Sequence, residues 1–180
     1  MRKVVVYELL SLDGVGESPE TFVLDYWDEV MDANLAEVIG TQDAVILGRR
    51  SYDEWAGYWP TSDVEPFASF INAVPKFVAT STPLGLAWNA ATAIDGDPAA
   101  FVRELRATDG GDIGVHASMS LARSLLAAGV VDELRLVVAP EIVGPGRRIL
   151  VDLAGIRLVT VDSRTSPRGA LLLTYRVLPA

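Results

Sequence analysis

Short apolar runs alternate with helix-forming stretches along most of this chain, and this alternation limits its fold more than any other feature. Five runs combine valine with other apolar residues and few charges, at residues 3–10, 43–47, 76–80, 112–115 and 134–139, and a weaker run lies at 89–94. Such runs are typical of strands that are covered on both faces. Strands that alternate with helices predict a mostly parallel sheet, and therefore an α/β fold.

Capping residues and helical periodicity predict the helices between these runs. Ser18 is a good N-cap before Pro19, and apolar residues recur at helical spacing from there to Ile39, where Gly40 ends the pattern. A short helix through Tyr52 and Trp55 is expected next. One helical turn is expected at residues 67–71, and longer helices at 97–106 and 119–128.

The last part of the chain holds strands only. Residues 156–161 and 170–177 flank Ser166-Pro167-Arg168-Gly169, a turn sequence that predicts an antiparallel hairpin. The expected sheet therefore has an antiparallel C-terminal edge and about four flanking helices. With 180 residues and no internal repeat or linker, the chain is expected to form a single domain over residues 1–180.

Composition argues against several classes of function. A net charge of −9 disfavours nucleic-acid binding, which needs cations to replace phosphate counterions. The chain has no cysteine and a single histidine, which excludes disulfides and thiolate metal sites and disfavours a histidine-rich metal site. No run approaches the roughly 20 apolar residues of a membrane span. The apolar run after the basic start is short and no cleavage site follows, so a first strand is favoured over a signal peptide and a cytoplasmic protein is expected.

Three predicted strand ends carry small, hydroxyl-bearing or glycine residues: Gly48-Arg49-Arg50-Ser51, Thr80-Ser81-Thr82 and His116-Ala117-Ser118-Met119-Ser120. Ligands of open α/β sheets bind at the carboxyl ends of strands, and helix N-termini attract phosphate. Together the segments predict one phosphate-bearing ligand across several strand ends. Each segment alone is also typical of an ordinary helix cap. Arg49 and Arg50 are likewise typical of a solvent-exposed pair. No Gly-x-Gly-x-x-Gly follows the first strand, which disfavours a Rossmann domain.

Several motifs in order resemble one known family. Ser11-Leu12-Asp13-Gly14 follows the first strand, residues 44–55 read AVILGRRSYDEW, and residues 131–134 and 140–146 read VDEL and PEIVGPG. With Thr80-Ser81-Thr82 between them, these motifs resemble the dihydrofolate-reductase-like family, to which the reductase domain of riboflavin biosynthesis belongs. The resemblance runs from the first strand to the last.

The resemblance implies a fold of about eight strands and four helices that binds NADPH, commonly as a homodimer. By likeness, Gly48, Arg49, Arg50 and Ser51 form the helix start that holds cofactor phosphate, and Thr80 to Thr82 lie near the adenosine ribose and its 2′-phosphate. The segment after the fifth strand supplies backbone N–H groups to the pyrophosphate, and comprises His116, Ala117, Ser118, Met119, Ser120 and Leu121.

The chain departs from the family pattern at four positions. Ala117 stands where family members usually have glycine, and Ser118 stands where they often have a second glycine. His116 stands where riboflavin-pathway enzymes have a substrate-facing glutamate. Val15 replaces a lysine of those enzymes. The pterin-gripping carboxylate of dihydrofolate reductases has only Asp25 or Asp28 as a counterpart.

Hydride transfer needs a nicotinamide held close to the reacting carbon, and one proton donor can assist. The candidate donors are Asp13, Asp28, Tyr52, Tyr58 and His116, with Asp13 favoured by its place after a strand end; the alternative is an ordinary turn aspartate. Substrate contacts are expected from Asp28, Tyr52, Trp55 and Tyr58, although aromatic residues at helical spacing more often belong to a core. These features predict an NADPH-dependent reductase of a small heterocycle. The alternative is a nucleotide-binding homologue that has lost catalysis.

Overall fold

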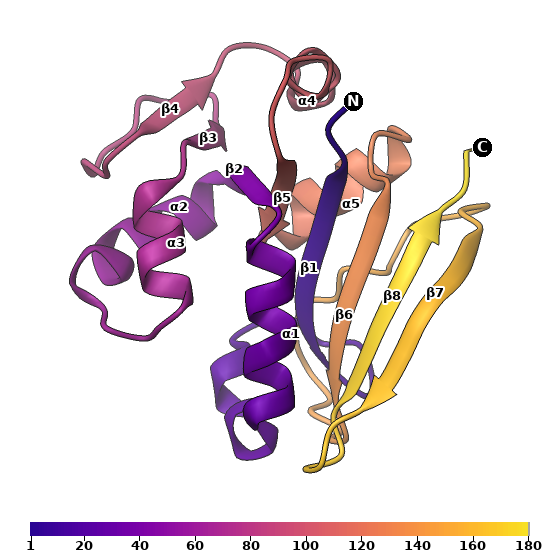
Figure 1. The fold of residues 1–180 in the computed structure, drawn as a ribbon. Helices are drawn as coiled ribbons and strands as arrows, with labels where there is room; N and C mark the ends of the chain where they lie inside the picture. Colours follow the sequence, from indigo (N-terminus) through magenta and orange to yellow (C-terminus); the bar gives the residue numbers. More distant parts are fainter. Residues whose placement is uncertain (180) are drawn as a thin grey trace.

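All eight predicted strands form, and they join in one sheet of order β4-β3-β2-β5-β1-β6-β8-β7 (Figure 1). The computed structural model describes residues 1–179. The strands are β1 (Val4–Ser11), β2 (Gln42–Gly48), β3 (Lys76–Ala79), β4 (Ala91–Ile94), β5 (Asp112–His116), β6 (Glu133–Ala139), β7 (Leu158–Thr165) and β8 (Leu171–Val177). The first six strands in sequence pair in parallel, whereas β8 is antiparallel to both β6 and β7. The predicted α/β fold with an antiparallel C-terminal edge is therefore confirmed.

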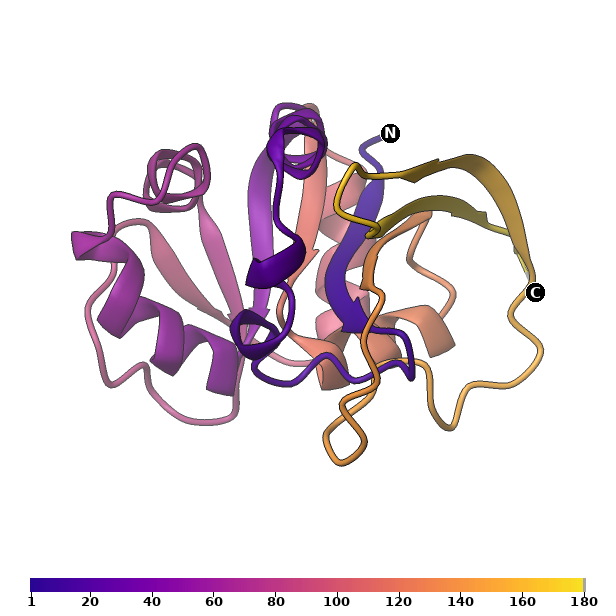
Figure 2. The same ribbon diagram turned by 90° about the horizontal axis from the view of Figure 1, so that it is seen from below.

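Five α-helices flank this sheet: α1 (Glu29–Ile39), α2 (Arg49–Tyr58), α3 (Phe67–Ala73), α4 (Pro98–Arg106) and α5 (Met119–Ala127). Helices α1 and α3 lie on one side of the sheet and α5 on the other (Figure 2). Each face of the sheet has its own apolar core. Side chains of α4 and α5 pack against Val6 and Val115 on one face, and those of α1 and α3 pack against Tyr7 and Val45 on the other. Because both faces are covered, the strands need the nearly continuous apolar runs that the sequence shows.

The first helix starts later than the sequence predicts. The expected cap, Ser18, has a left-handed backbone (φ 47°) and makes no side-chain cap bond. Two short 3-10 turns, η1 (Pro19–Thr21) and η2 (Leu24–Tyr26), follow it. Asp28 caps α1 instead, because its carboxylate accepts hydrogen bonds from the amides of Val30 and Met31. A carboxylate that accepts hydrogen bonds from two free N–H groups stabilises a helix N-terminus more than a serine whose side chain accepts none.

The topology points to one crevice. Strands β1 and β5 are parallel neighbours, with Val4 opposite Ile113 and Tyr7 opposite His116. From β1 the chain crosses through α1 to β2, whereas from β5 it crosses through α5 to β6 on the opposite face. The chain thus leaves two neighbouring strands in opposite directions. At such a switch point, open α/β sheets form a ligand-binding crevice outside the carboxyl ends of the strands.

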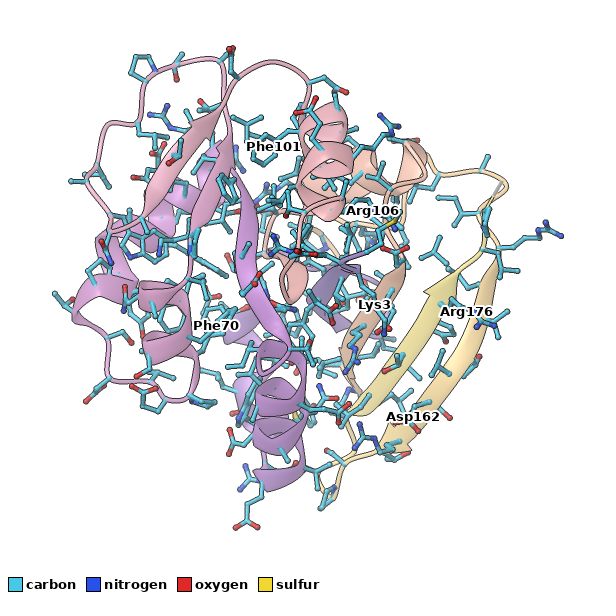
Figure 3. The ribbon with its side chains drawn as sticks, turned by 45° about the horizontal axis from the view of Figure 1, so that its top comes forward. Lys3, Phe70, Phe101, Arg106, Asp162 and Arg176 are labelled. Carbon is cyan, nitrogen blue, oxygen red and sulfur yellow. The ribbon has the colours of Figure 1, made fainter. Side chains whose placement is uncertain are left out.

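The C-terminal hairpin forms the other end of the sheet. Strand β7 is an edge strand, and most of its residues are exposed. Figure 3 shows Asp162 and Arg176 on these outer strands, far from Phe70 on α3. Within residues 1–179, no helix has both the length and the hydropathy that crossing a bilayer requires.

Candidate functional site

Two of the predicted strand-end segments lie together at the switch point. The backbone N–H of Gly48, at the end of β2, donates to the Ser118 hydroxyl at 2.9 Å. The Ser51 hydroxyl, in the first turn of α2, donates to the Ala117 carbonyl at 2.8 Å. Ser51 and Ser118 are both buried, so these bonds are shielded from water. Two short hydrogen bonds therefore tie the start of α2 to the start of α5.

Ala117 has a backbone conformation that favours glycine. Its φ is 49°, in the left-handed region, where a Cβ costs on the order of 1 kcal/mol. The strain is tolerated because β5 must turn sharply into α5 at this point. The Ala117 side chain is exposed, so its methyl group lies on the surface of the turn.

The N-terminus of α5 offers free amides beside that turn. The first N–H groups of a helix have no intrahelical partner, and they lie at the positive end of the helix dipole. The side chains of Met119 and Leu121 are buried in the core, so these residues present only their backbone to a ligand. Ser120 is exposed. The segment can thus bind an anion through backbone groups alone.

The third strand-end segment is held by Arg49. Its Nη1 donates to the Thr82 hydroxyl at 2.6 Å, to the Pro83 carbonyl at 2.8 Å and to the Thr80 hydroxyl at 3.3 Å. Its Nε donates to both carboxylate oxygens of Asp53, at 2.9 and 2.8 Å. The guanidinium group is therefore fixed on the loop after β3, and the structure brings residues 48–51 and 80–82 together. Arg50, the other predicted arginine, is exposed.

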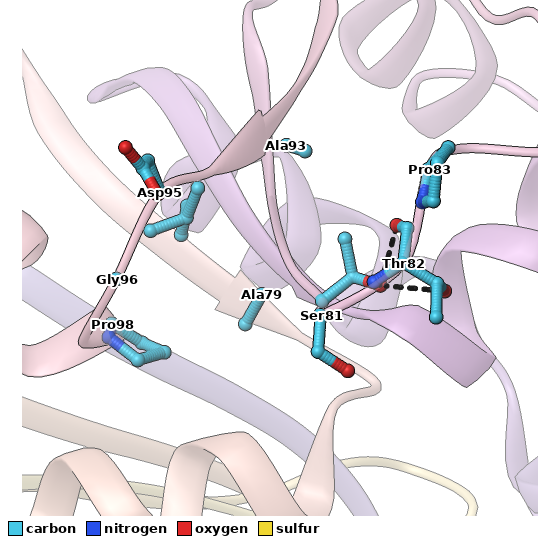
Figure 4. Close-up of a pocket in the computed structure, with 10 residues that line it drawn as sticks. Ala79, Ser81, Thr82, Pro83, Ala93, Asp95, Gly96 and Pro98 are labelled. Atoms are coloured by element: carbon cyan, nitrogen blue, oxygen red, sulfur yellow. Dashed lines mark hydrogen bonds between the residues drawn. The ribbon is translucent and has the colours of Figure 1, made fainter.

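A cavity of about 700 Å³ opens at the carboxyl ends of β3 and β4. One wall is the loop that Arg49 holds, with Ser81 and Thr82, and the opposite wall includes Asp95, Gly96 and Pro98 (Figure 4). The floor is small and apolar, with Ala79 and Ala93. Its size and mixed polar and apolar lining suit a flat heterocycle joined to a sugar.

Asp13 joins the loop after β1 to the loop after β6 through hydrogen bonds and an ion pair. Its carboxylate accepts hydrogen bonds from the Ser11 hydroxyl at 2.7 Å and from the amides of Val143 and Gly144 at 3.1 and 2.9 Å, and it pairs with Arg148 at 3.1 Å. These bonds, first of all that from Ser11, hold the pKa of Asp13 well below its usual range. A carboxyl group in this state has no proton to donate at neutral pH. The geometry therefore favours the turn role for Asp13 over proton donation.

Two predicted substrate-binding residues are structural. Tyr52 is fully buried, and its hydroxyl donates to the Leu86 carbonyl at 2.6 Å, so this side chain belongs to the core. Asp28 caps α1 and also accepts from the Arg168 amide at 3.0 Å. The assignment of Tyr52 is therefore corrected, because this side chain is buried in the core, whereas Asp28 serves as a helix cap.

His116 also has a different place from the one predicted. It is the last residue of β5 rather than part of the turn, and it is 2% exposed. Its Nε2 hydrogen-bonds Gln42 Oε1 at 2.8 Å, and its ring packs against Tyr7 and Phe67. Burial lowers its pKa to about 3, so the imidazole is neutral. Gly114 makes this pair possible, because a Cβ there would lie 2.1 Å from the Gln42 oxygen.

An aromatic cluster spans α2 and α3. The rings of Trp55 and Tyr58 meet Trp59 edge-on at centroid distances of 5.8 and 5.0 Å, and Phe67 lies 5.4 Å from Trp55. Tyr58 is 53% exposed and Trp55 is half-buried. Of the four predicted substrate-binding residues, these two keep a surface that a heterocycle could contact.

The sequence prediction missed Glu8, which is 3% exposed in β1. Burial raises its pKa to about 8, although a hydrogen bond from the Ser118 backbone amide opposes the shift. Buried carboxyl groups with a raised pKa cluster at functional sites. The signal was visible in the sequence, because Glu8 is the only charged residue within the apolar run 4–10.

Comparisons with known proteins agree with this architecture. The chain is 26% identical over 179 residues to the uncharacterised protein YyaP of Bacillus subtilis (strain 168), with 97% of this chain and 94% of YyaP covered. A solved structure from Shewanella sp. PV-4, of a protein named for riboflavin biosynthesis, superposes with a TM-score of 0.75 at 17% identity and covers 98% of this chain and 99% of its own. A pyrimidine reductase-like protein from Corynebacterium diphtheriae gives 0.70 at 15% identity, with 99% and 93% covered.

A bifunctional enzyme of Thermotoga maritima, a diaminohydroxyphosphoribosylaminopyrimidine deaminase and 5-amino-6-(5-phosphoribosylamino)uracil reductase, has the same fold in part. Its TM-score is 0.67 at 14% identity, and this chain spans 57% of its length. At such identities the structural matches establish a shared fold alone. The match to a family model goes further, because residues 2–172 fit the RibD C-terminal domain. The chain therefore belongs to the RibD C-terminal domain family.

Proposed function

We propose that this protein is an NADPH-dependent reductase that transfers hydride to a small heterocyclic substrate of the pterin or pyrimidinone type, and that it acts in the cytoplasm. One observation carries the proposal: segments 48–51, 80–82 and 116–121, which lie far apart in the sequence, meet at the carboxyl edge of the sheet beside the switch point. Relatives of the family are named as reductases of pyrimidine substrates.

The residues present fit a dinucleotide. The free amides at the start of α5 would bind the pyrophosphate, as helix N-termini do. The cavity beside Thr80, Ser81 and Thr82 would take the adenosine, and Arg49, already fixed by Asp53, would meet the 2′-phosphate with the guanidinium nitrogen that makes no hydrogen bond within residues 1–179. Bound NADPH would supply the hydride. The chain would supply orientation, an apolar floor and a helix dipole.

The substrate would lie toward the aromatic cluster, where Trp55 and Tyr58 keep accessible ring surface. Aromatic faces stack on flat heterocycles. Neither Asp13, which is ionised, nor His116, which is neutral and buried, has a proton to give at neutral pH. Because neither of these two predicted residues can act as the proton donor, we keep a second candidate, a nucleotide-binding homologue without catalysis.

Titration calorimetry with NADPH and NADH tests the cofactor. We expect NADPH to bind at least about tenfold more tightly, because charge-assisted hydrogen bonds to a phosphate contribute roughly 1.5–3 kcal/mol. The Arg49→Met variant should lose this preference, and its affinity for NADH should fall less than its affinity for NADPH, because Arg49 also holds the loop beside the cavity. Equal affinities for the two cofactors in the unmodified protein would show that the 2′-phosphate site is wrongly placed.

A substrate screen that follows the loss of cofactor absorbance separates the two candidate functions. Turnover of a pterin or pyrimidinone supports the reductase. Tight NADPH binding without turnover of any heterocycle in the screen supports the binding homologue.

We also propose that the protein is a two-fold homodimer that buries the outer strands. Strand β7 and the start of β8 expose apolar side chains that a sheet edge would otherwise leave in water: Leu158, Val159, Val161 and Leu171. Apolar residues gathered on an edge strand are typical of an interface between subunits.

A further inference from the structure

Glu8 lies in β1, beside the turn that leads from β5 into α5. Residues at alternate positions of a strand share a face, so Glu8 points to the same side as Val6 and Leu10, which pack under α5. The β1–β5 pairing ends at Tyr7 opposite His116, so Glu8 is one residue beyond it. At that level the chain of β5 has already turned into α5, so the Glu8 carboxyl group lies close to the Ser118 amide, which favours its ionised form.

The Glu8 carboxyl group is almost completely enclosed. It is 3% exposed, and its Oε1 has no hydrogen-bond partner within residues 1–179. A fully ionised carboxylate normally occupies several donors when it is buried. With one backbone amide and no cation, the neutral acid is the better-tolerated form. Accordingly the pKa of Glu8 is raised to about 8 by burial, the dominant cause.

Within residues 1–179, the side chains that share the face of Glu8 are apolar, and the charged groups of the surrounding elements are paired with other residues or exposed. Leu134, Leu136 and Val138 on β6 and Val115 on β5 share the face of Glu8, and all are apolar. His116 points to the opposite face and is neutral. On α5, Arg123 pairs with Asp152, and Arg148, between β6 and β7, pairs with Asp13 on the loop after β1. On α2, Arg49 pairs with Asp53 and Arg50 is exposed.

We propose that Glu8 is a proton-dependent gate on the cofactor site: its ionised carboxylate holds the Ser118 amide and repels the pyrophosphate from the start of α5, whereas its neutral form lets the pyrophosphate bind. This inference rests on the proposed function, because it needs an anionic ligand at that helix end. The physical basis is one positive helix end shared by two anions, one built into the chain and one brought by the ligand.

The expected effect follows from Coulomb's law. A carboxylate and a phosphate at the same helix end repel each other, and the protein surroundings screen this repulsion far less than water does. Affinity for NADPH should therefore fall by at least about tenfold as Glu8 ionises. The 2′-phosphate titrates near pH 6 and stays doubly ionised above it, so it contributes no change in the same range.

The test is the Kd of NADPH from about pH 6.5 to about pH 9.5, a range that brackets the Glu8 pKa of about 8. The unmodified protein should lose affinity across this range, and Glu8→Gln, which keeps the shape without the charge, should show a flat profile. Glu133→Gln is the matched control, since Glu133 pairs with Lys3 at the other end of the sheet and should leave the loss unchanged. Adenosine, which carries no phosphate, should bind the unmodified protein equally at all pH values.

The outcomes separate the gate from the cofactor assignment. If NADPH binds with the same affinity at every pH, or if Glu8→Gln keeps the pH dependence, the gate is refuted and the reductase proposal stands. If NADPH fails to bind at any pH, both are refuted. If Glu8→Gln does not fold, the contrast between NADPH and adenosine in the unmodified protein decides, and equal pH profiles for the two ligands overturn the proposal.

Discussion

Replacing Ser118 with alanine should loosen the tie between the starts of α2 and α5. In the structure the Ser118 hydroxyl accepts the Gly48 N–H at 2.9 Å and makes no cap bond within its own helix. The substitution therefore removes one long-range hydrogen bond and leaves the helix cap as it was. Because Ser118 is buried, the Gly48 amide would lose its partner without gaining water.

An unpaired buried amide costs about 1–3 kcal/mol. For a chain of this length, each kcal/mol lowers Tm by roughly 2–4 °C, so Ser118→Ala should lower Tm by about 2–12 °C. NADPH affinity should fall as well, because the two segments would no longer be held in register. Thermal and guanidinium unfolding measure the first effect and calorimetry the second.

The matched control is Ser120→Ala, two residues further on and exposed, which should stay within about 0.5 kcal/mol of the unmodified protein. Ser51→Ala removes the companion bond to the Ala117 carbonyl, and a double-mutant cycle with Ser118→Ala should show coupling, since both bonds join the same two segments. If Ser118→Ala unfolds at the same temperature as Ser120→Ala, the tie does not exist in solution and the assembly of the site must be explained otherwise.

Three further predictions concern other parts of the chain. Ala117→Gly should raise the free energy of unfolding by about 0.5–1 kcal/mol, because the backbone φ of 49° favours glycine. Ala117→Leu should fold but lose its affinity for NADPH. A Leu variant that binds NADPH as well as the parent would show that the phosphate turn is misplaced. Glu8 has a folded pKa of about 8 against an ordinary 4.5, so its contribution to stability is complete below about pH 4.5 and is lost as pH rises through 8. Glu8→Gln should lack this decline in urea unfolding, and parallel pH profiles would contradict the assignment. Light scattering at micromolar concentration should give a dimer that Val161→Glu dissociates and the exposed loop control Val64→Glu does not; a monomeric parent would end the dimer proposal.

The strands could be predicted because their signal is local. A run such as residues 43–47 is apolar whichever neighbours it meets, and a doubly covered sheet requires it to be so. The three strand-end segments met as expected for the same reason, since carboxyl ends of parallel strands share one edge. Helix α1 is capped by Asp28 instead of Ser18, and the Asp28 carboxylate also binds the Arg168 amide, a contact that joins residues 140 positions apart.

Side-chain roles at the site depended on contacts of that long-range kind. Asp13 binds the amides of Val143 and Gly144, which no local pattern at Ser11-Leu12-Asp13-Gly14 specifies. Tyr52 was assigned to the substrate although its hydroxyl is satisfied by Leu86, a carbonyl on a loop whose course the sequence does not define. The sequence can place a polar residue at a site. Whether its polar atom is free to bind a ligand depends on whether a distant backbone group of the folded chain already hydrogen-bonds it.

His116 and Glu8 show that alternation within a strand determines which face of the sheet a polar residue reaches. In β5, Ile113 and Val115 face α4 and α5, so His116, one step further, must face the opposite core, where Gln42 and the gap left by Gly114 receive it. In β1 the same period places Glu8 with Val6 and Leu10, under the start of α5. The two polar residues therefore end on opposite faces of neighbouring strands: the histidine is a neutral part of the core, and the carboxyl group remains beside the helix end where an anion would bind. Strand period combined with the parallel pairing of β1 and β5 thus identifies which of the two can influence the ligand.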